Sequence, residues 1–198
     1  ALISLVEQGK NVVSSRHMFG NTYSLLTKTL PRFGVTTHLC DLTNLDEVRS
    51  AVDADTCCIF LEIITNPQLE VADLAALAEI AHEHNIPLVA DTTAIPFTEF
   101  NAHELGVDIE VVSTTKYLSG GATSLGGIVI DYGGFPEFAR RLHDEMLFNL
   151  GAYMTPHVAY MQNLGLENLN ARYAMQVRNT EYLVNALRGL EQIKSVNY

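Results

Sequence analysis

One lysine of the sequence stands directly after three hydroxyl residues and before a glycine-rich segment. Ser113, Thr114 and Thr115 precede Lys116, and four glycines follow within residues 117–127. Hydroxyls, and backbone N–H groups that small residues leave accessible, suit an anionic group such as phosphate. The lysine could serve there as a phosphate contact or as a Schiff-base nucleophile, or it could be an exposed loop lysine without a role. The stretch alone leaves these interpretations open.

Two upstream apolar runs also end near residues with chemical capacity. Residues 56–63 are followed by Asn66, and residues 87–90 are followed by Asp91. Both runs are typical of short buried strands, and ligands of open α/β sheets bind outside the carboxyl ends of the strands. We therefore expect these side chains to meet Lys116 at one rim of a sheet. Taken singly, Asp91 is also compatible with a helix or turn cap, and Asn66 before a proline with a turn.

The combined residue types meet the chemical needs of pyridoxal 5'-phosphate (PLP). This cofactor requires a lysine for its aldehyde, a carboxylate that keeps its pyridine nitrogen protonated, and hydroxyl or N–H groups for its phosphate. An aromatic ring can stack on the pyridine face, and an amide can hydrogen-bond the phenolic oxygen. The candidates for these roles are, in that order, Lys116, Asp91, Ser113 with Thr115, Phe19 and Asn66.

Other motifs do not support a different chemistry. His82 and His84 lie two residues apart on an expected helix and point to different faces, so we expect no metal site there. The glycines after Lys116 open no clear helix, unlike a dinucleotide fingerprint. No G-x-S-x-G motif of a serine hydrolase is present, and no cysteine lies in a loop with a partner histidine. Phe19 by itself would be interpreted as a core residue.

The composition limits the class of protein. The chain has 198 residues, enough for one domain with a sizeable core, and has no apolar run long enough to cross a bilayer. Its net charge is −11 and its twelve lysines and arginines are scattered, which argues against nucleic-acid or anionic-membrane partners. Cys40, Cys57 and Cys58 form no disulfide framework and suit a reducing compartment. We therefore expect a cytoplasmic location.

Short apolar runs alternate with segments of helical periodicity along the chain. This order predicts an α/β fold with a largely parallel sheet and helices on both of its faces. The expected strands are 11–15, 35–40, 56–63, 87–90, 109–112 and 127–131. The expected helices are 1–8, 22–33, 44–52, 73–84, 99–105, 135–146, 156–164 and 168–190. The first helix lacks an N-cap and the last residues begin an extended segment, so we expect a piece of a longer polypeptide.

Four motifs follow one another in a characteristic order. They are E-I-I-T-N-P (62–67), P-L-V-A-D-T-T (87–93), V-V-S-T-T-K-Y-L-S-G-G (111–121) and L-G-G-I-V-I-D (125–131). This order resembles the Cys/Met-metabolism family of PLP-dependent enzymes, which have fold type I and include O-acetylhomoserine sulfhydrylases, cystathionine gamma-synthases and gamma-lyases. The resemblance covers essentially the whole chain. Residues 125–135 most resemble the O-acetylhomoserine sulfhydrylase branch.

The resemblance implies a role for each candidate residue. Lys116 would be the Schiff-base lysine and proton shuttle, and Asp91 would pair with the pyridine nitrogen. The phosphate, the ring face and the ring hydroxyl would be contacted by Ser113 with Thr115, by Phe19 and by Asn66, respectively. The family usually has a tyrosine that assists catalysis at the position of Phe19, which can stack on the ring but cannot transfer a proton.

The resemblance also implies a domain arrangement. Residues 1–167 would form an incomplete PLP-binding large domain of the fold-type-I transferases, truncated at its N-terminus. Residues 168–198 would form a long linking helix and the start of a C-terminal small domain. The family's phosphate-binding glycine loop, its N-terminal segment that reaches a neighbouring subunit, and the arginine that holds the substrate carboxylate would lie outside the chain.

These inferences predict a PLP-dependent enzyme of sulfur amino acid metabolism. We expect it to replace the γ-substituent of an O-acylated homoserine with sulfide or a thiol, giving homocysteine or a related sulfur amino acid. Two alternatives stay open: γ-elimination of the methionine or cystathionine gamma-lyase type, and a non-catalytic piece that helps to assemble an oligomer. An unrelated phosphate-binding module is a third, less favoured alternative. The family implies a homo-oligomer, a dimer or tetramer, with active sites shared between subunits.

Overall fold

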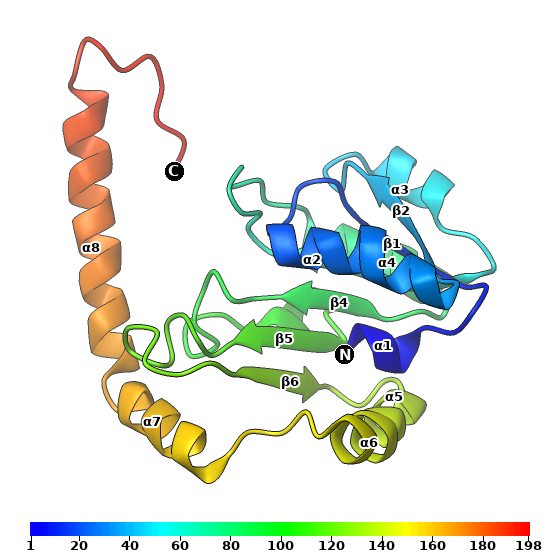
Figure 1. Ribbon diagram of the computed structural model, residues 1–198. Helices are drawn as coiled ribbons and strands as arrows, with labels where there is room; N and C mark the ends of the chain where they lie inside the picture. Colours follow the sequence, from blue (N-terminus) through cyan, green and yellow to red (C-terminus); the bar gives the residue numbers. More distant parts are fainter.

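The computed structural model describes residues 1–198 and contains one six-stranded sheet (Figure 1). The strand order is β2-β1-β3-β4-β5-β6, and every neighbouring pair is parallel except β5 with β6, which is antiparallel. The strands are β1 (Asn11–Ser15), β2 (Thr36–Cys40), β3 (Thr56–Glu62), β4 (Leu88–Asp91), β5 (Ile109–Ser113) and β6 (Gly127–Asp131). The expected α/β fold with a largely parallel sheet is therefore confirmed.

Helices connect the strands and cover both faces of the sheet. The α-helices are α1 (Leu2–Leu5), α2 (Gly20–Ser24), α3 (Leu45–Ala51), α4 (Leu74–Glu83), α5 (Pro136–Arg141), α6 (Phe148–Leu150), α7 (Pro156–Leu166) and α8 (Leu169–Arg188). Tighter or wider helical turns are η1 (Leu25–Thr29), η2 (Leu30–Phe33), η3 (Ala102–Leu105) and η4 (Leu142–Leu147), of which η1 and η2 continue α2, and η4 joins α5 to α6. None of the helices combines the length and the apolar character that crossing a membrane requires.

Capping side chains begin three of the helices. Asn44, Asp73 and Thr155 precede α3, α4 and α7, and each side chain accepts a hydrogen bond from the backbone N–H three residues later. These bonds satisfy N–H groups that have no partner within the helix. Helices expected at 44–52 and 73–84 are therefore confirmed, with ends shifted by one residue.

Two expected helices are shorter than the sequence pattern indicates. The segment 1–8 is helical only over α1, because Val6 adopts extended backbone angles and packs into the core. The segment 99–105 is helical only over η3, because Asn101 is extended and its side chain donates to Glu104 Oε1 at 2.8 Å. Core packing in the first case and a local side-chain contact in the second, not the apolar spacing, determine where the helix begins or ends.

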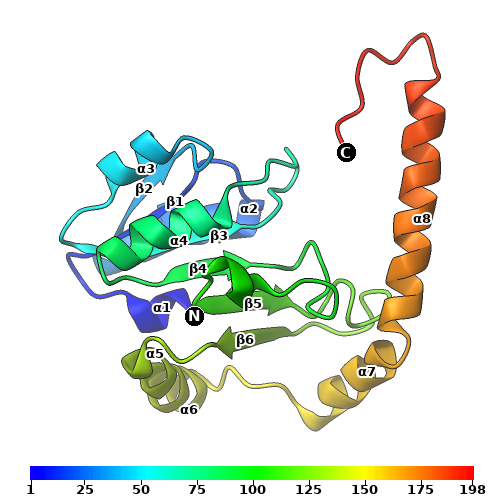
Figure 2. The same cartoon turned by 180° about the vertical axis from the view of Figure 1, so that it is seen from behind.

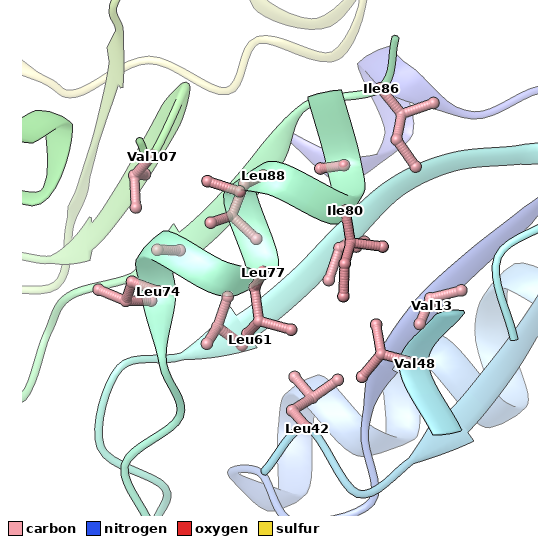
Figure 3. Packing of buried hydrophobic residues seen from close by; sticks show 14 of the residues in the cluster. Val13, Leu42, Val48, Leu61, Leu74, Leu77, Ile80, Ile86, Leu88 and Val107 are labelled. Atoms are coloured by element: carbon pink, nitrogen blue, oxygen red, sulfur yellow. The ribbon is translucent and has the colours of Figure 1, made fainter. Parts of the chain in front are cut away.

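The central strands bury side chains on both faces, in two hydrophobic clusters. On the face covered by α3 and α4, the cluster includes Val13, Leu61, Leu77, Ile80 and Leu88 (Figure 3). On the opposite face, covered by α1 and the helix that α2 begins, the cluster includes Val12, Leu26, Phe60, Val89 and Phe138 (Figures 1 and 2). Burial on both faces explains why β3 and β4 are mostly apolar runs without polar alternation.

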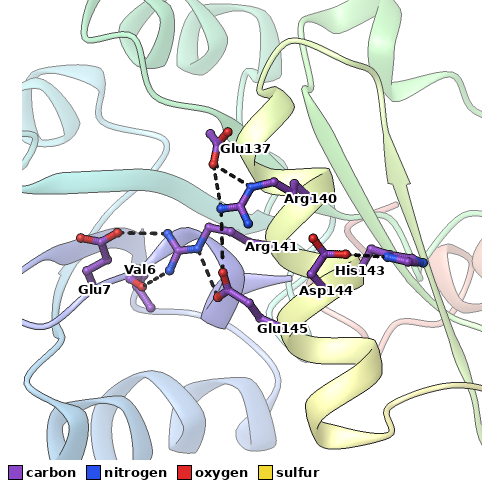
Figure 4. Close-up of polar contacts among 8 residues, drawn as sticks. All are labelled: Val6, Glu7, Glu137, Arg140, Arg141, His143, Asp144 and Glu145. Atoms are coloured by element: carbon purple, nitrogen blue, oxygen red, sulfur yellow. Dashed lines mark hydrogen bonds and ion pairs between the residues drawn. The ribbon is translucent and has the colours of Figure 1, made fainter.

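One ion pair and one hydrogen bond connect the helix that α5 begins to the first residues of the chain (Figure 4). The Arg141 guanidinium lies 3.2 Å from Glu7 Oε1, donates to the Val6 carbonyl at 3.4 Å, and lies 3.6 Å from Glu145 Oε2. Exposed ion pairs contribute little stability individually, so the buried Phe138 of α5 is the stronger anchor.

The last two long helices lie beyond the carboxyl ends of the parallel strands. In both views α7 passes below this end of the sheet, and α8 projects away from the body (Figures 1 and 2). The two helices are joined near Leu169, which is buried. Their junction is therefore next to the rim where the sequence predicts a ligand.

Candidate functional site

Three neighbouring parallel strands end side by side at one rim of the sheet. Glu62 at the end of β3 is in register with Asp91 at the end of β4, and Asp91 is in register with Val111 of β5. β5 ends two residues later at Ser113, and Lys116 follows in the next loop. The structure therefore brings the predicted strand-end residues to one edge, as parallel strands require.

Glu62 is a buried carboxylate that holds two site segments together. Glu62 is only 7% exposed. Its Oε1 accepts from the Phe19 N–H at 2.7 Å, and its Oε2 accepts from the Asn66 N–H at 3.0 Å. Burial raises the pKa of Glu62, the two N–H groups act in the opposite direction, and the nearby Asp91 charge adds to the increase. This one carboxylate thus links the segment of the predicted stacking ring to that of the predicted amide.

Asp91 lies beside Glu62 and is fixed by the residues that follow it. Its Oδ1 accepts from the Thr93 N–H at 2.9 Å, and the Thr93 hydroxyl accepts from the Ser113 N–H at 2.8 Å. Burial raises the pKa of Asp91, and the bonds from Thr93 oppose this shift. Thr93 therefore connects the carboxylate of β4 to the end of β5.

The amine of Lys116 lies over an aromatic ring. Its Nζ is 5.9 Å from the centroid of the Phe19 ring, at the outer limit of a cation–π contact. Phe19 is 45% exposed, so much of the ring remains open to a ligand. A flat aromatic ligand stacked on this ring would come close to the lysine amine.

The loop after Lys116 closes back onto the residues before it through Gly126. The Gly126 carbonyl accepts from the Thr114 N–H at 3.1 Å, and the Gly126 N–H donates to Thr115 Oγ1 at 3.2 Å. A Cβ at Gly126 would lie 2.6 Å from Thr114 Oγ1, so no other residue fits without displacement. The hydroxyl of Thr115, a predicted phosphate contact, therefore also has a partner within the chain.

Helices α7 and α8 anchor the same loop by main-chain contacts. The Arg172 guanidinium donates to the Tyr117 carbonyl at 2.9 Å and to the Gly165 carbonyl at 2.7 Å. A Cβ at Gly165 would lie 2.0 Å from the Leu118 carbonyl oxygen, so this close approach requires glycine. Neither Arg172 nor Gly165 was predicted as part of the site, because nothing local in the sequence indicates which loop a helix will contact.

The converging residues fit PLP in their chemistry. A lysine amine lies over an open aromatic ring, and a carboxylate lies on the neighbouring strand. The Asn66 side-chain amide has no hydrogen-bond partner within the chain and is available to a ligand, whereas its backbone N–H is bound by Glu62. The donor set therefore suits an aldehyde-bearing aromatic cation with a phosphate. Thr93, which connects Asp91 to Ser113, was not among the predicted site residues. Its position two residues after a strand-end carboxylate is the signal that could have indicated it.

Comparison with known proteins agrees with this chemistry. The family described as Cys/Met metabolism PLP-dependent enzyme matches residues 1–198. The chain is 32% identical to the L-methionine gamma-lyase of Fusobacterium nucleatum, across 100% of this chain and 50% of the lyase. It spans about half the length of the curated relatives that it matches.

Solved structures of other proteins have the same fold. The O-acetylhomoserine sulfhydrylase of Wolinella succinogenes is 41% identical with a TM-score of 0.89, over 100% of this chain and 61% of that one. A protein described as a putative O-acetylhomoserine (thiol)-lyase of Campylobacter jejuni is 32% identical with a TM-score of 0.93, over 100% and 56%. That structure contains N'-pyridoxyl-lysine-5'-monophosphate, a lysine joined to the cofactor.

Proposed function

The chain belongs to the Cys/Met metabolism family of PLP-dependent enzymes, and we propose that its protein carries out γ-replacement on an O-acylated homoserine. Sulfide or a thiol would take the place of the γ-substituent, giving homocysteine or a related sulfur amino acid. The relatives support this choice, because sulfhydrylases of homoserine esters are among them. The site described above would carry the reaction.

Each candidate residue has a distinct task in this proposal. PLP, when bound, supplies an electron sink that stabilises negative charge at the substrate's α-carbon. Asp91 keeps the pyridine nitrogen protonated, and Phe19 holds the ring face. Ser113 and Thr115 bind the phosphate, and Asn66 orients the ring hydroxyl.

Lys116 has two tasks, one of binding and one of proton transfer. Its amine would hold the cofactor between turnovers. Once displaced by the amino substrate, it would take the proton from the α-carbon, pass it to the bound cofactor, and then take a second proton from the β-carbon. The γ-substituent would leave with its bonding electrons, the sulfur nucleophile would bond to the γ-carbon in its place, and protons would return to the β- and α-carbons through the same amine. Phe19 cannot assist, because its ring carries no exchangeable proton, so we assign the proton transfers to Lys116 alone.

The observation that carries the proposal is the position of the Lys116 amine over the Phe19 ring. Phe19 is bound through its N–H to Glu62, which is in register with Asp91. The lysine, the stacking ring and the pyridine-pairing carboxylate are therefore linked by neighbouring contacts at one rim.

The cofactor assignment is tested by labelling. Purified protein is mixed with PLP, its near-visible absorption is recorded, and borohydride reduction is followed by peptide mapping. We expect an absorption band and label at Lys116, with both absent in Lys116→Ala and retained in Lys28→Ala, which changes an exposed lysine. Label spread over surface lysines in the unaltered protein would contradict the assignment.

The reaction itself is tested by following sulfide. With O-acetylhomoserine and sulfide, γ-replacement consumes sulfide and forms homocysteine, and Lys116→Ala should lose about a hundredfold to ten-thousandfold in rate. γ-Elimination is the second candidate, because the methionine gamma-lyase relative matches the entire chain. Release of a thiol and a 2-oxo acid from methionine or homocysteine, without replacement, would favour it.

The domain and assembly predictions are also retained as proposals. We assign residues 1–167 to the cofactor-binding large domain and residues 168–198 to a link toward a smaller domain, supported by the projection of α8 from the body (Figure 1). We also retain the cytoplasmic location and the homo-oligomer with shared active sites as proposals. The oligomer is supported by large exposed apolar side chains, including Leu125 in the loop after Lys116. A non-catalytic scaffold would bind PLP weakly and show neither reaction.

A further inference from the structure

Helix α7 buries a polar side chain that the proposed mechanism does not use. Its buried residues are Gln162 and Gly165, which lie one turn apart and face the loop after Lys116. The larger apolar side chains of the same helix, Tyr160 and Leu164, are exposed. The face of α7 that packs inward is therefore a glutamine and a glycine, the reverse of an ordinary amphipathic helix.

Gln162 contacts the far end of the loop that Lys116 begins. Its Nε2 donates to Ser124 Oγ at 2.8 Å and lies 3.5 Å from the Ser124 carbonyl oxygen. Its Oε1 is buried and has no hydrogen-bond partner. A buried amide oxygen without a partner costs free energy, so an apolar side chain of the same size would suit stability equally well or better.

Gly126 connects this contact to the lysine. A Cβ at Gly126 would lie 3.4 Å from Gln162 Nε2 on one side and 2.6 Å from Thr114 Oγ1 on the other. Gly126 is also bonded through its backbone to both Thr114 and Thr115, the two residues before Lys116. Gln162 thus borders a residue that joins the end of the loop to its start.

We propose that Gln162 is a positioning residue that holds residues 124–126 in place and thereby fixes the segment that carries Lys116. This inference rests on the proposed function of Lys116 and adds a residue from outside the rim to it. It explains why an incompletely satisfied amide occupies a buried position where an apolar residue would fit. It also assigns a role to α7, which contributes no side chain to the cofactor directly.

Hydrogen exchange tests the proposal without requiring activity. Gln162→Met keeps the side-chain size and removes the amide, and Gln176→Met makes the same change at an exposed position of α8. We expect backbone amides in residues 113–127 to exchange about three- to tenfold faster in Gln162→Met, because one net hydrogen bond is lost. The melting temperature should stay unchanged or rise, and Gln176→Met should alter neither quantity.

Ser124→Ala provides a second variant at a partly exposed position, which removes the acceptor and leaves Gln162 intact. It should accelerate exchange in the same segment, and the double variant should exchange no faster than the single ones. Unchanged exchange of residues 113–127 in both single variants would overturn the proposal. So would a fall in melting temperature in Gln162→Met with the loop still protected, because the glutamine would then serve only packing.

PLP binding separates this inference from the proposed function. If Lys116 is the cofactor lysine, Gln162→Met should weaken PLP binding roughly three- to tenfold, whereas Gln176→Met should not. If the unaltered protein shows no label at Lys116, the proposed function fails, and hydrogen exchange still decides the role of Gln162. Faster exchange with unchanged PLP affinity would overturn the link between the Gln162 contact and the cofactor.

Discussion

Two buried glutamates of this protein are bound in different ways. Glu62, at the end of β3, accepts hydrogen bonds from two backbone N–H groups, those of Phe19 and Asn66. Glu110, within β5 and only 1% exposed, accepts from two side-chain hydroxyls, those of Thr92 and Tyr132. The two carboxylates are similarly buried, but only Glu62 is bound by groups that can donate a hydrogen bond and cannot accept one.

The nature of the partners determines what each glutamate can do. A backbone N–H always donates and its direction is fixed, so Glu62 needs two acceptor oxygens in fixed places. A hydroxyl can rotate and can donate or accept, so the partners of Glu110 tolerate a change in that side chain. We infer that Glu62 specifies the geometry of the rim, whereas Glu110 only satisfies a buried position.

The two glutamates also differ in what surrounds them. Glu62 lies between site segments, whereas Glu110 lines a cavity of about 420 Å³ with Phe97, Phe100 and Tyr132. None of the predicted site residues lines this cavity. The chemistry is located instead by the convergence of the strand ends.

The largest effect is expected from Glu62→Gln. The glutamine would present its NH₂ group to one of the two backbone N–H donors and leave that donor unsatisfied, at a cost of about 2–3 kcal/mol in the free energy of unfolding. Chemical denaturation measures this cost, and PLP titration should show weaker binding. Glu79→Gln, at an exposed position of α4, serves as the control. If Glu62→Gln were as stable as Glu79→Gln, the fixed amide partners of Glu62 would not distinguish it from Glu110.

A smaller effect is expected from Glu110→Gln. The hydroxyls of Thr92 and Tyr132 can rotate to accept from the new NH₂ group, so we expect a loss of about 1 kcal/mol in the free energy of unfolding. PLP affinity should fall less than in Glu62→Gln, because Glu110 reaches the site only through the Thr92 hydroxyl, and the Thr92 backbone is also held by the Val111 carbonyl. A loss as great as that of Glu62→Gln would show that hydroxyl partners are no more adaptable than amides.

Asp91→Asn should increase the free energy of unfolding of the cofactor-free protein, whereas the two glutamate variants should decrease it. Burial raises the pKa of Asp91 in the folded chain, so its contribution to stability is favourable below the unfolded pKa and is lost as the pH rises through the folded value. Asparagine removes the ionised, buried form, and we expect a gain of roughly 1 kcal/mol at neutral pH that disappears in acid. Denaturation at several pH values checks this, and destabilisation at neutral pH would contradict it. PLP binding and turnover should nevertheless fall.

The smallest effect is expected from Tyr132→Phe. Burial, followed by the hydrogen bond to Glu110, raises the pKa of Tyr132 to about 12. The resulting stability is fully present below the unfolded pKa near 10 and is lost as the pH rises through about 12. We expect the variant to lose about 0.5 kcal/mol at pH 8, and the difference from the unaltered protein to shrink at pH 11. A difference in the free energy of unfolding that grows with pH would contradict this prediction.

Much of the fold follows from patterns that operate over a few residues. Apolar runs such as 56–63 and helical spacing in 73–84 predict the alternation of strands and helices, because burial on one or both faces imposes a period. Errors occur where a single contact overrides the pattern, as at Val6, which extends into the core and ends α1 after four residues. The antiparallel direction of β6 is likewise decided by its pairing with β5.

The candidate site divides in the same way. The amino-acid sequence by itself determined the set of reactive residues, with Lys116 after three hydroxyls and Asp91 after an apolar strand, because strand ends in a parallel sheet must share one rim. Only the tertiary structure decided what holds them: the amides bound to Glu62, and the approach of α7 that buries Gln162 and Gly165. The contacts of Glu62 with Phe19 and of Gln162 with Ser124 join segments more than thirty residues apart, and no local period of the sequence encodes which surfaces will meet.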